Sequence, residues 1–375
     1  MAQLGAHTGL ILLTGEYDSQ VVAQLFETLS PFAIEILDVE QFIIRDRIFL
    51  TTLFQLNHVH AKAITSDVEA LAKRLNFDVA LDFRDYEDKQ VRWKTVCLSE
   101  KNLTPAVINL VAAMIETSGA KLLGIRRKAT DSLRTLEFQI SVTKDLTELV
   151  ADLAKEENLN LYIPAPLNSR SLIIFDVDST LIKHEVIDLL GRFVGKEDEI
   201  AAITEEAMSG GIDFAESLKR RVALLATAPV SILDHTLEMI EFSDGVEKLI
   251  AKLQGDGHEV ALVSGGFIEV VGPLAKRLNI KYFRANELEI SEGHLTGNIK
   301  GEIIDKLGKA KALCDFAEHL GIEMAHTIAI GDGANDLEML DLAGVGIAYR
   351  AKSLVREMAM ISFKDMDAIA QYLGL

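Results

Sequence analysis

The sequence predicts two small α+β units of βαββαβ order, followed by an α/β domain with a doubly wound parallel sheet. From Ser171 to Leu375, short apolar strands alternate with amphipathic helices, which is typical of such a sheet. Before that part, one order of strands and helices occurs twice. Between the two parts, the segment 164–169 (Pro-Ala-Pro-Leu-Asn-Ser) indicates a linker, because its prolines extend neither a strand nor a helix.

The two βαββαβ units are expected at 1–85 and 86–166, with a polar joint at 85–89. Apolar periodicity places their strands and helices, and each unit has the size of an antiparallel sheet backed by two helices. In chain order, the segments of the first unit are 9–13, 19–28, 34–45, 48–56, 68–75 and 78–81. Those of the second unit are 92–98, 106–117, 121–127, 135–142, 146–157 and 160–163.

The α/β domain is expected at 167–375. Its candidate strands are the apolar runs 172–175, 260–264, 281–285, 327–331 and 344–348. A mainly helical insertion at about 184–239 separates the first two strands. We expect this insertion to form a cap that excludes water from the crevice beyond the strands and selects the substrate.

Composition excludes several classes of protein. The chain has 375 residues, of which 49% are hydrophobic and 25% charged, as in globular proteins. A net charge of -19 argues against a nucleic-acid binder, which needs clustered Lys and Arg. The two cysteines, Cys97 and Cys314, lack metal-ligand spacing, so neither a zinc site nor a disulfide framework is expected. This fits a reducing, cytoplasmic location. The sequence shows neither an export signal nor an apolar run long enough to span a membrane.

Two carboxylates follow the first strand of the α/β domain. The run 172–175 is apolar without alternation, as in a strand covered on both faces, and Asp176 and Asp178 come directly after it. The ligand crevice of a parallel sheet lies at this end of the strands. We therefore expect both carboxylates to face the crevice. The alternative is that they only cap the following helix, since Asp is a preferred capping residue.

Two further strand ends have polar residues. Ser264-Gly265-Gly266 provides a hydroxyl and glycine amides that can approach phosphate oxygens, although this pattern is also an ordinary turn. The segment 331–336 (Gly-Asp-Gly-Ala-Asn-Asp) provides the oxygen ligands that Mg2+ prefers. Lys309 lies before that strand, and taken alone it would be a surface lysine.

Together these residues resemble the four motifs of the haloacid dehalogenase superfamily, in order and spacing. The four matching stretches are 176–180 (Asp-Val-Asp-Ser-Thr), 264–266, Lys309 and 331–336, within a match that spans 171–375. Inside that superfamily, the chain resembles the phosphoserine phosphatases. The residues that carry this closer resemblance are Glu185 and the stretches 206–210, 214–222 and 263–267.

The resemblance implies Mg2+-dependent hydrolysis of O-phospho-L-serine to L-serine and phosphate, the last step of serine biosynthesis. Asp176 would be the nucleophile that forms an aspartyl phosphate, and Asp178 the general acid and then the general base. Mg2+ would bind Asp176, the backbone carbonyl of Asp178 and Asp332, with Asp336 behind them. The groups that would bind the phosphate are Ser264, the amide of Gly265, Lys309 and Asn335.

The cap would recognise the serine part of the substrate. The resemblance implies that Glu185 binds the ammonium group, Arg221 binds the carboxylate as a bidentate fork, and Met208 and Phe214 form apolar walls. The alternative is that Glu185 is an exposed helix residue and Arg221 is part of the solvated basic run 219–221.

The first half resembles tandem ACT domains, which often pair edge to edge and bind amino acids at their interfaces. Modules that bind a ligand usually have a Gly in the loop after the first strand. That loop contains Gly15 in the first copy, whereas Ser99-Glu100-Lys101-Asn102 of the second copy contains none. The resemblance implies a homodimer. The alternative is that the two units only support dimerisation or stability.

Three other functions remain open. A phosphatase of broader scope would share the catalytic motifs. A phosphoacceptor signalling domain would keep a phosphorylated Asp, but Asp178 would shorten the lifetime of that state. A catalytically idle amino-acid sensor would need broken motifs, and the motifs are intact.

Overall fold

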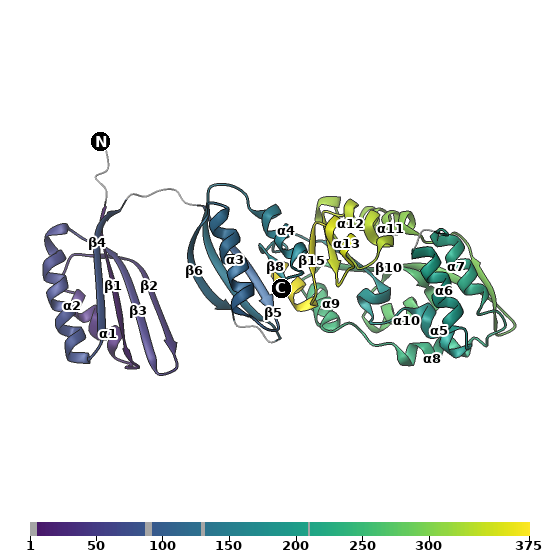
Figure 1. Cartoon of the computed structure of the whole chain (residues 1–375), viewed down its shortest axis with the longest axis horizontal. Helices are drawn as coiled ribbons and strands as arrows, with labels where there is room; N and C mark the ends of the chain where they lie inside the picture. The colour runs from purple at the N-terminus through teal and green to yellow at the C-terminus, as the bar shows by residue number, and fades with distance from the viewer. Residues whose placement is uncertain (1–5, 87–91, 129–131, 209–210) are drawn as a thin grey trace. The chain divides into compact units, whose positions relative to one another are not determined.

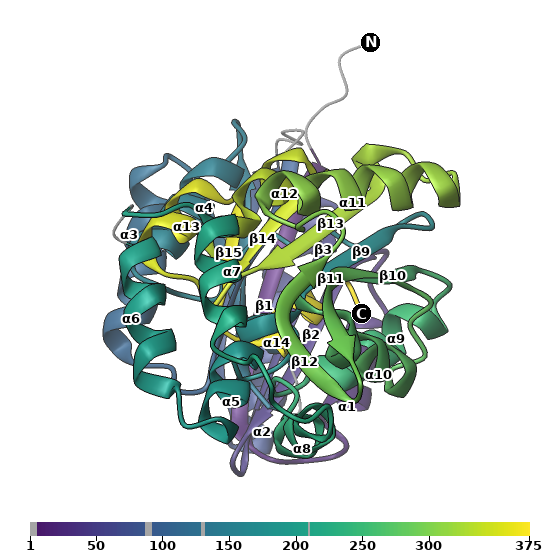
Figure 2. The same ribbon diagram turned by 90° about the vertical axis from the view of Figure 1, so that its right-hand side faces the viewer.

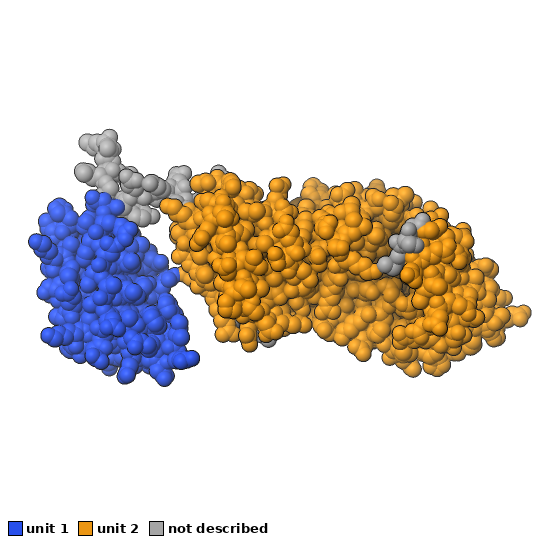
Figure 3. Space-filling model, viewed as in Figure 1, with its two compact units in different colours: residues 1–90 blue, residues 91–375 orange. Residues whose placement is uncertain are grey.

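The computed structural model describes residues 6–86, 92–128, 132–208 and 211–375 (Figure 1). The chain forms two compact units, Met1–Gln90 and Val91–Leu375, which have different colours in Figure 3. Most of the predicted joint at 85–89 lies outside the described residues. Among the described residues, no helix combines the length and apolar character needed to cross a membrane.

The first unit has the predicted βαββαβ order. Its elements are β1 (Ala6–Glu16), α1 (Val21–Leu29), β2 (Glu35–Ile44), β3 (Arg47–Gln55), the 3-10 helix η1 (His58–His60), α2 (Ala61–Leu75) and β4 (Asp78–Tyr86). They form an antiparallel sheet of order β2-β3-β1-β4, against which the two helices pack their apolar faces. The helix α2 and the strand β4 are longer than predicted. Their added residues are largely polar, and backbone pairing to β1 holds the added part of β4.

The second unit begins with the same order. Its first elements are β5 (Arg92–Glu100), α3 (Pro105–Thr117), β6 (Lys121–Lys128), β7 (Arg134–Val142), α4 (Thr147–Glu156) and β8 (Leu161–Tyr162). The antiparallel sheet has the order β6-β7-β5-β8. Helix α3 begins where Thr104 accepts a hydrogen bond from the N–H of Val107, with Pro105 in the first turn, where a missing N–H costs nothing.

The rest of the second unit is built on a seven-stranded sheet of order β12-β11-β10-β9-β13-β14-β15. The strands are β9 (Leu172–Asp176), β10 (Glu259–Phe267), β11 (Tyr282–Ser291), β12 (His294–Lys300), β13 (Thr327–Gly331), β14 (Val345–Tyr349) and β15 (Ile361–Phe363). All neighbours pair in parallel except β11 and β12. The strands β12 and β15 are absent from the sequence prediction, because polar residues interrupt β12 and β15 is very short.

Helices cover both faces of this sheet (Figure 2). The helices α9 (Val246–Gly255), α10 (Ile268–Arg277) and α14 (Met366–Tyr372) pack in one core, and α11 (Lys306–Leu320), α12 (Leu337–Leu342) and α13 (Ser353–Met358) in the other. The central strand β9 supplies alternate residues to the two cores: Ile173 and Phe175 to one, Leu172 and Ile174 to the other. All of β9 is buried, as its unbroken apolar run predicts.

In the described part of the chain between β9 and α9, α-helices follow the short π-helix η2 (Val177–Leu181). They are α5 (Val186–Phe193), α6 (Glu197–Met208), α7 (Phe214–Ala223) and α8 (Ser231–Met239). The 3-10 helices η3 (Met324–His326) and η4 (Ala334–Asp336) flank β13. Because β10 and β13 both pair with β9, the carboxyl ends of these three strands meet, and the predicted polar residues follow those ends.

The linker segment is hydrogen-bonded to the C-terminal end of the chain. The N–H of Ala165 donates to the carbonyl of Tyr372 (2.8 Å), and that of Leu167 to the carbonyl of Leu373 (3.0 Å). Nearby, the side-chain carbonyl of Gln371 accepts hydrogen bonds from three hydroxyl groups of the second βαββαβ module. These are Ser99 Oγ (3.3 Å), Thr135 Oγ1 (2.9 Å) and Tyr162 OH (3.1 Å).

Candidate active site

The turn after β9 brings two carboxylates to one place. Asp176 is the last residue of the strand and is buried. The chain then turns sharply, with Ser179 in the left-handed region at φ 58°. The turn leaves Asp178 Oδ1 in reach of the N–H of Val186, at the start of α5 (2.8 Å). Asp178 thus contacts a helix N-terminus, as the capping alternative expects, and also belongs to a larger polar site.

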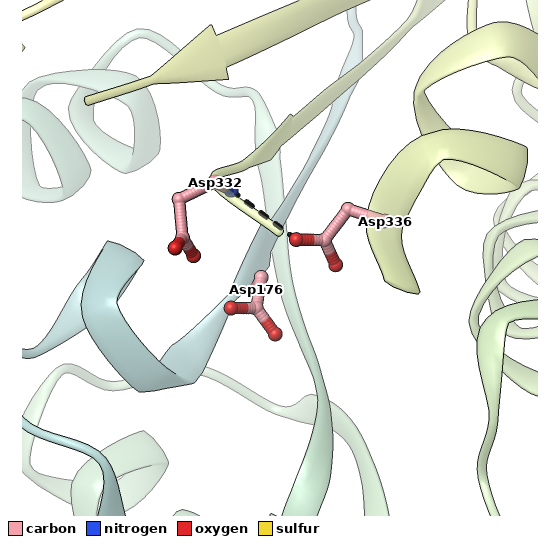
Figure 4. Close-up of side chains that lie close together, drawn as sticks. All are labelled: Asp176, Asp332 and Asp336. Carbon is pink, nitrogen blue, oxygen red and sulfur yellow. Dashed lines mark hydrogen bonds between the residues drawn. The ribbon is translucent and has the colours of Figure 1, made fainter. Parts of the chain in front are cut away.

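Three carboxylates from two segments, the end of β9 and the segment 331–336, cluster at this end of the sheet (Figure 4). Asp176, Asp332 and Asp336 each place an oxygen within 4.8 Å of the others. Burial raises the pKa of Asp332 to about 6, and the charge of Asp336 adds to the rise. Burial also raises the pKa of Asp176, helped by the charge of Asp336. The three carboxylates repel one another, and a divalent cation such as Mg2+, which prefers oxygen ligands, would relieve this repulsion.

Asp336 is fully buried, and both of its oxygens have partners. Its Oδ1 accepts from Lys309 Nζ (2.7 Å). Its Oδ2 accepts from the backbone N–H groups of Asp332 (3.2 Å) and Gly333 (3.0 Å), and the first of these bonds is drawn in Figure 4. Asp336 therefore holds the loop after β13 and the ammonium group of Lys309 in fixed positions.

Lys309 is a buried ion-pairing residue, so the surface alternative is wrong. It lies in the first turns of α11 and is 1% exposed. Its ammonium group contacts both Asp176 and Asp336. Burial opposes its charge, but the charges of Asp176 and Asp336 prevail and raise the pKa of Lys309. It therefore places a permanent positive charge beside Asp176.

The Ser-Gly-Gly segment interrupts the pairing of β10 with β11. The register between these strands shifts between Val263 and Phe267. Ser264 is buried, and its Oγ donates to Asp178 Oδ2 (3.0 Å) and accepts from the N–H of Gly266 (2.7 Å). Burial raises the pKa of Asp178, and the hydrogen bonds from Val186 and Ser264 oppose the rise.

A ring from α7 lies against the same segment. A Cβ added at Gly265 would lie 2.8 Å from Phe214 Cζ, closer than carbon atoms approach. Glycine is therefore required at this position if the ring is to stay in place. The contact brings the start of helix α7 over the Ser-Gly-Gly segment of β10.

Two charged residues of the predicted cap lie near enough to Asp178 for their charges to interact with it. Glu185 is exposed, as its alternative expects, and its Oε1 accepts from Ser179 Oγ (2.8 Å). Desolvation of its carboxylate by neighbouring residues raises its pKa to about 7, and the charge of Asp178 adds a smaller effect. Arg221 is 9% exposed, so the alternative of a solvated basic residue is wrong for it. The charges of Glu185, Asp188 and Asp178 all act on Arg221. In contrast, its neighbour Arg220 points outward to Glu206 (3.0 Å).

Three predicted site residues remain: Phe214 and Asn335 are described by the structure, and the side chain of Met208 is not. Phe214 is half-buried and packs on the larger core. Asn335 is half-buried, and its Oδ1 is so close to Gly333 that a Cβ there would clash. The side chain of Met208 lies outside the described residues.

Two residues of the site have no role in the sequence prediction, although Thr180 belongs to the motif 176–180. Thr180 is buried, and its Oγ1 donates to Asp332 Oδ1 (3.0 Å), which links the turn after β9 to the loop after β13. Asp188 lies one helical turn after Glu185; its carboxylate is half-buried, and its charge interacts with that of Arg221. The i, i+3 spacing of Glu185 and Asp188 is a signal that could have placed them on one face of α5.

Comparisons with known proteins agree with this site. The family model of haloacid dehalogenase-like hydrolases matches residues 173–341, and the ACT domain model matches residues 7–82. A phosphoserine phosphatase of Mycobacterium tuberculosis is 38% identical, over 98% of this chain and 93% of the relative. A phosphoserine phosphatase of Streptomyces coelicolor is 36% identical, over 98% of this chain and 92% of the relative.

Solved structures show the same fold. A haloacid dehalogenase family hydrolase of Salmonella enterica serovar Typhi has a TM-score of 0.66 at 29% identity, covering 75% of this chain and 98% of that one. A substrate-bound phosphoserine phosphatase has a TM-score of 0.52 at 38% identity, covering 55% and 99%. The chain belongs to the phosphoserine phosphatase family of the haloacid dehalogenase-like hydrolases, with an ACT domain in its N-terminal part.

Proposed function

We propose that the chain hydrolyses O-phospho-L-serine to L-serine and phosphate, as the last step of serine biosynthesis. One observation supports this most strongly: two residues of opposite charge, Glu185 and Arg221, lie near enough to Asp178 for their charges to interact with its carboxylate. A phosphoserine has an ammonium and a carboxylate besides its phosphate. A site that reads it therefore needs one anion and one cation next to the phosphate-binding groups. The relatives named above support the same substrate.

In the first step, a carboxylate oxygen of Asp176 attacks phosphorus and displaces the serine oxygen, which takes a proton from Asp178. The product is an aspartyl phosphate on Asp176 and free serine. In the second step, Asp178 accepts a proton from water, and the water oxygen attacks phosphorus and releases phosphate. Asp176 is then free again, and Asp178 is protonated for the next cycle. The raised pKa of Asp178 suits this role, because the acid must hold its proton when the ester binds.

The phosphate is expected to meet donors from three segments. Ser264 Oγ, the N–H of Gly265, Lys309 Nζ and Asn335 would bind its oxygens. Lys309 already contacts Asp176, so it would stabilise charge that develops between the nucleophile and the phosphate.

The carboxylates around Asp176 fit Mg2+. Asp176, Asp332 and the backbone carbonyl of Asp178 would hold it, whereas Asp336 stays bound to Lys309 and the loop. The bound ion would supply positive charge to the phosphate oxygens and lower the pKa of Asp176.

The cap is expected to decide which ester reacts. Glu185 would bind the ammonium group when ionised, and Arg221 would bind the carboxylate through two parallel hydrogen bonds. Phe214 and Met208 would form apolar walls that exclude water. The cap at about 184–239 and the domain boundaries 1–85, 86–166 and 167–375 remain part of this proposal.

We keep the homodimer as a proposal, together with the cytoplasmic location. The edge strand β2 supports the former, because an edge strand with exposed apolar side chains tends to pair with another chain. The exposed apolar residues of β2 are Ile36, Leu37, Val39, Phe42, Ile43 and Ile44.

The test is phosphate release from L-phosphoserine, with Mg2+ and with excess EDTA, beside phosphothreonine and a nitrophenyl phosphate. We expect a metal-dependent preference for phosphoserine. If only the nitrophenyl phosphate is hydrolysed, the assignment of the catalytic residues stands and the assignment of phosphoserine as the substrate is wrong. Equal activity with excess EDTA would reject the Mg2+ assignment.

A further inference from the structure

We propose that Asn286 is a positioning residue, which fixes the phosphate-binding segment 264–266 of β10 to the helix that bears Lys309. This inference rests on the proposed function, which assigns Ser264, Gly265 and Lys309 to the phosphate. It adds a residue from β11, a strand to which the catalytic motifs give no role.

Asn286 takes the place of a missing backbone partner. The strand β10 pairs with β11 up to Val263, which lies opposite Arg284, and again at Phe267, which lies opposite Asn286. Between these points the ladder is broken. The side chain of Asn286 is 1% exposed, and its Nδ2 donates to the carbonyl of Gly265 (2.8 Å). The side-chain amide therefore satisfies a partly buried carbonyl that the break in the β10–β11 ladder leaves without a backbone partner.

The hydrogen bond from Asn286 fixes one peptide plane of the phosphate-binding segment. The carbonyl of Gly265 and the N–H of Gly266 belong to the same planar group. That N–H donates to Ser264 Oγ (2.7 Å), which in turn donates to Asp178 Oδ2 (3.0 Å). A rotation of this plane would therefore disturb the hydroxyl that meets the phosphate and the carboxylate that moves the proton.

The other end of the Asn286 amide holds the start of α11. Its Oδ1 accepts from the N–H of Ile304 (2.8 Å). The next residue, Asp305, caps α11 by accepting from the N–H of Gly308 (2.9 Å), and its carbonyl accepts from the N–H of Lys309 (2.9 Å). One amide thus joins the segment that contains Ser264 to the turn that presents Lys309.

The chemistry of the two contacts selects an amide. Gly265 presents an acceptor and Ile304 a donor, so the bridging side chain needs one donor and one acceptor at fixed separation. An aspartate keeps the size and the acceptor for Ile304 but loses the donor for Gly265. Asn286 is 1% exposed and its two partners are partly buried, so water does not cheaply replace a lost hydrogen bond.

The test uses Asn286→Asp and the smaller Asn286→Ser, each assayed on phosphoserine and on a nitrophenyl phosphate. Both substrates share the phosphate, so we expect kcat/KM to fall by the same factor for both. Removing a residue that orients a ligand usually costs about 10- to 100-fold, and we expect a loss of that size. Inorganic phosphate, titrated calorimetrically with Mg2+ present, should bind more weakly by a comparable factor.

A matched control is Asn160→Asp, which changes another buried amide far along the chain. Asn160 Nδ2 donates to the carbonyl of Ser99 (2.8 Å), and its Oδ1 accepts from the N–H of Lys364 (2.8 Å). This variant should unfold at a lower temperature yet keep the kinetic constants and the phosphate affinity. Circular dichroism and thermal unfolding of every variant distinguish an unfolded protein from a folded one in which the phosphate-binding groups are displaced.

Two results would overturn the proposal. One is an Asn286 variant that is folded and keeps kcat/KM and phosphate affinity within about twofold of the unaltered chain. The other is a fall in kcat/KM for phosphoserine alone, which would mean that Asn286 acts on recognition of the serine part and not on the phosphate. If the unaltered chain fails on phosphoserine while phosphate binding still depends on Asn286, the proposed substrate is wrong and the positioning role stands.

Discussion

At the scale of single residues, the site depends on charges that are buried together. Lys309 contacts Asp176 and Asp336, and Arg221 lies among Glu185, Asp188 and Asp178. Isolated charges are costly away from water, so each is accompanied by an opposite charge or by hydrogen bonds. This arrangement makes the separate roles of these residues testable by single substitutions.

We expect Arg221→Ala to remove selectivity rather than catalysis. The loss of a bidentate, charge-assisted contact should cost about 2 to 4 kcal/mol of transition-state stabilisation, or roughly 30- to 700-fold in kcat/KM for phosphoserine. A nitrophenyl phosphate has no carboxylate, so its kcat/KM should change little. Arg220→Ala is the control, since Arg220 points to Glu206. Equal losses on both substrates would contradict the role of Arg221.

The pKa of Glu185 predicts a pH dependence of selectivity. Its pKa is raised to about 7, so the carboxylate is ionised above that pH and loses its charge below it. The ratio of kcat/KM for phosphoserine to that for a nitrophenyl phosphate should therefore fall as the pH drops through about 7. Taking the ratio removes effects common to both esters. In Glu185→Gln the ratio should be low and independent of pH, and a dependence that persists in this variant would refute the assignment.

At the scale of elements, the order of strands creates the site. The sequence is sufficient to predict β9, β10 and β13, because their apolar runs are unbroken and end in polar residues. It is insufficient for β12, for the first half of α2 and for the second half of β4, where backbone pairing and tertiary packing determine the structure. Spacing alone also leaves the contacts of Thr180 and Asn286 unpredicted, because both depend on how the strands align.

The contact between α7 and the Ser-Gly-Gly segment of β10 provides a test at this scale. In Gly265→Ala the new methyl group would overlap the Phe214 ring, so α7 and Arg221 should shift. A displacement on the order of 1 Å can lower a rate by up to about 100-fold, so we expect kcat/KM for phosphoserine to fall by about 10-fold or more. In a Phe214→Leu background, the same substitution should lower kcat/KM clearly less. Identical losses in the two backgrounds would show that the ring contact does not matter.

At the scale of the whole molecule, the second βαββαβ module and the α/β part form one compact unit. The prolines of segment 164–169 correctly indicate a stretch without strand or helix, but they do not reveal that it pairs with the C-terminal end of the chain. That pairing joins segments far apart in sequence, so local patterns contain no signal for it. The hydroxyl groups around Gln371 are likewise unremarkable in sequence.

Gln371→Leu should therefore destabilise the second unit without impairing catalysis. Removing the shared acceptor leaves the hydroxyl groups of Ser99, Thr135 and Tyr162 without that partner, which should cost about 1 to 3 kcal/mol. Chemical unfolding measures the loss, and kcat/KM should stay unchanged. Thr135→Val should cost less in the Gln371→Leu background than in the unaltered chain, because the two residues share one contact. Strictly additive losses would contradict this coupling.

The central claim is that Asp176 accepts the phosphoryl group and that Asp178 is needed to release it. The most direct measurement is rapid mixing of Asp178→Asn with a nitrophenyl phosphate, whose leaving group departs without a proton donor. We expect a burst of about one nitrophenol per chain, slow turnover after it, and a phosphoryl group on Asp176 by mass spectrometry. The absence of a burst, or a phosphoryl group on another residue, would contradict the account.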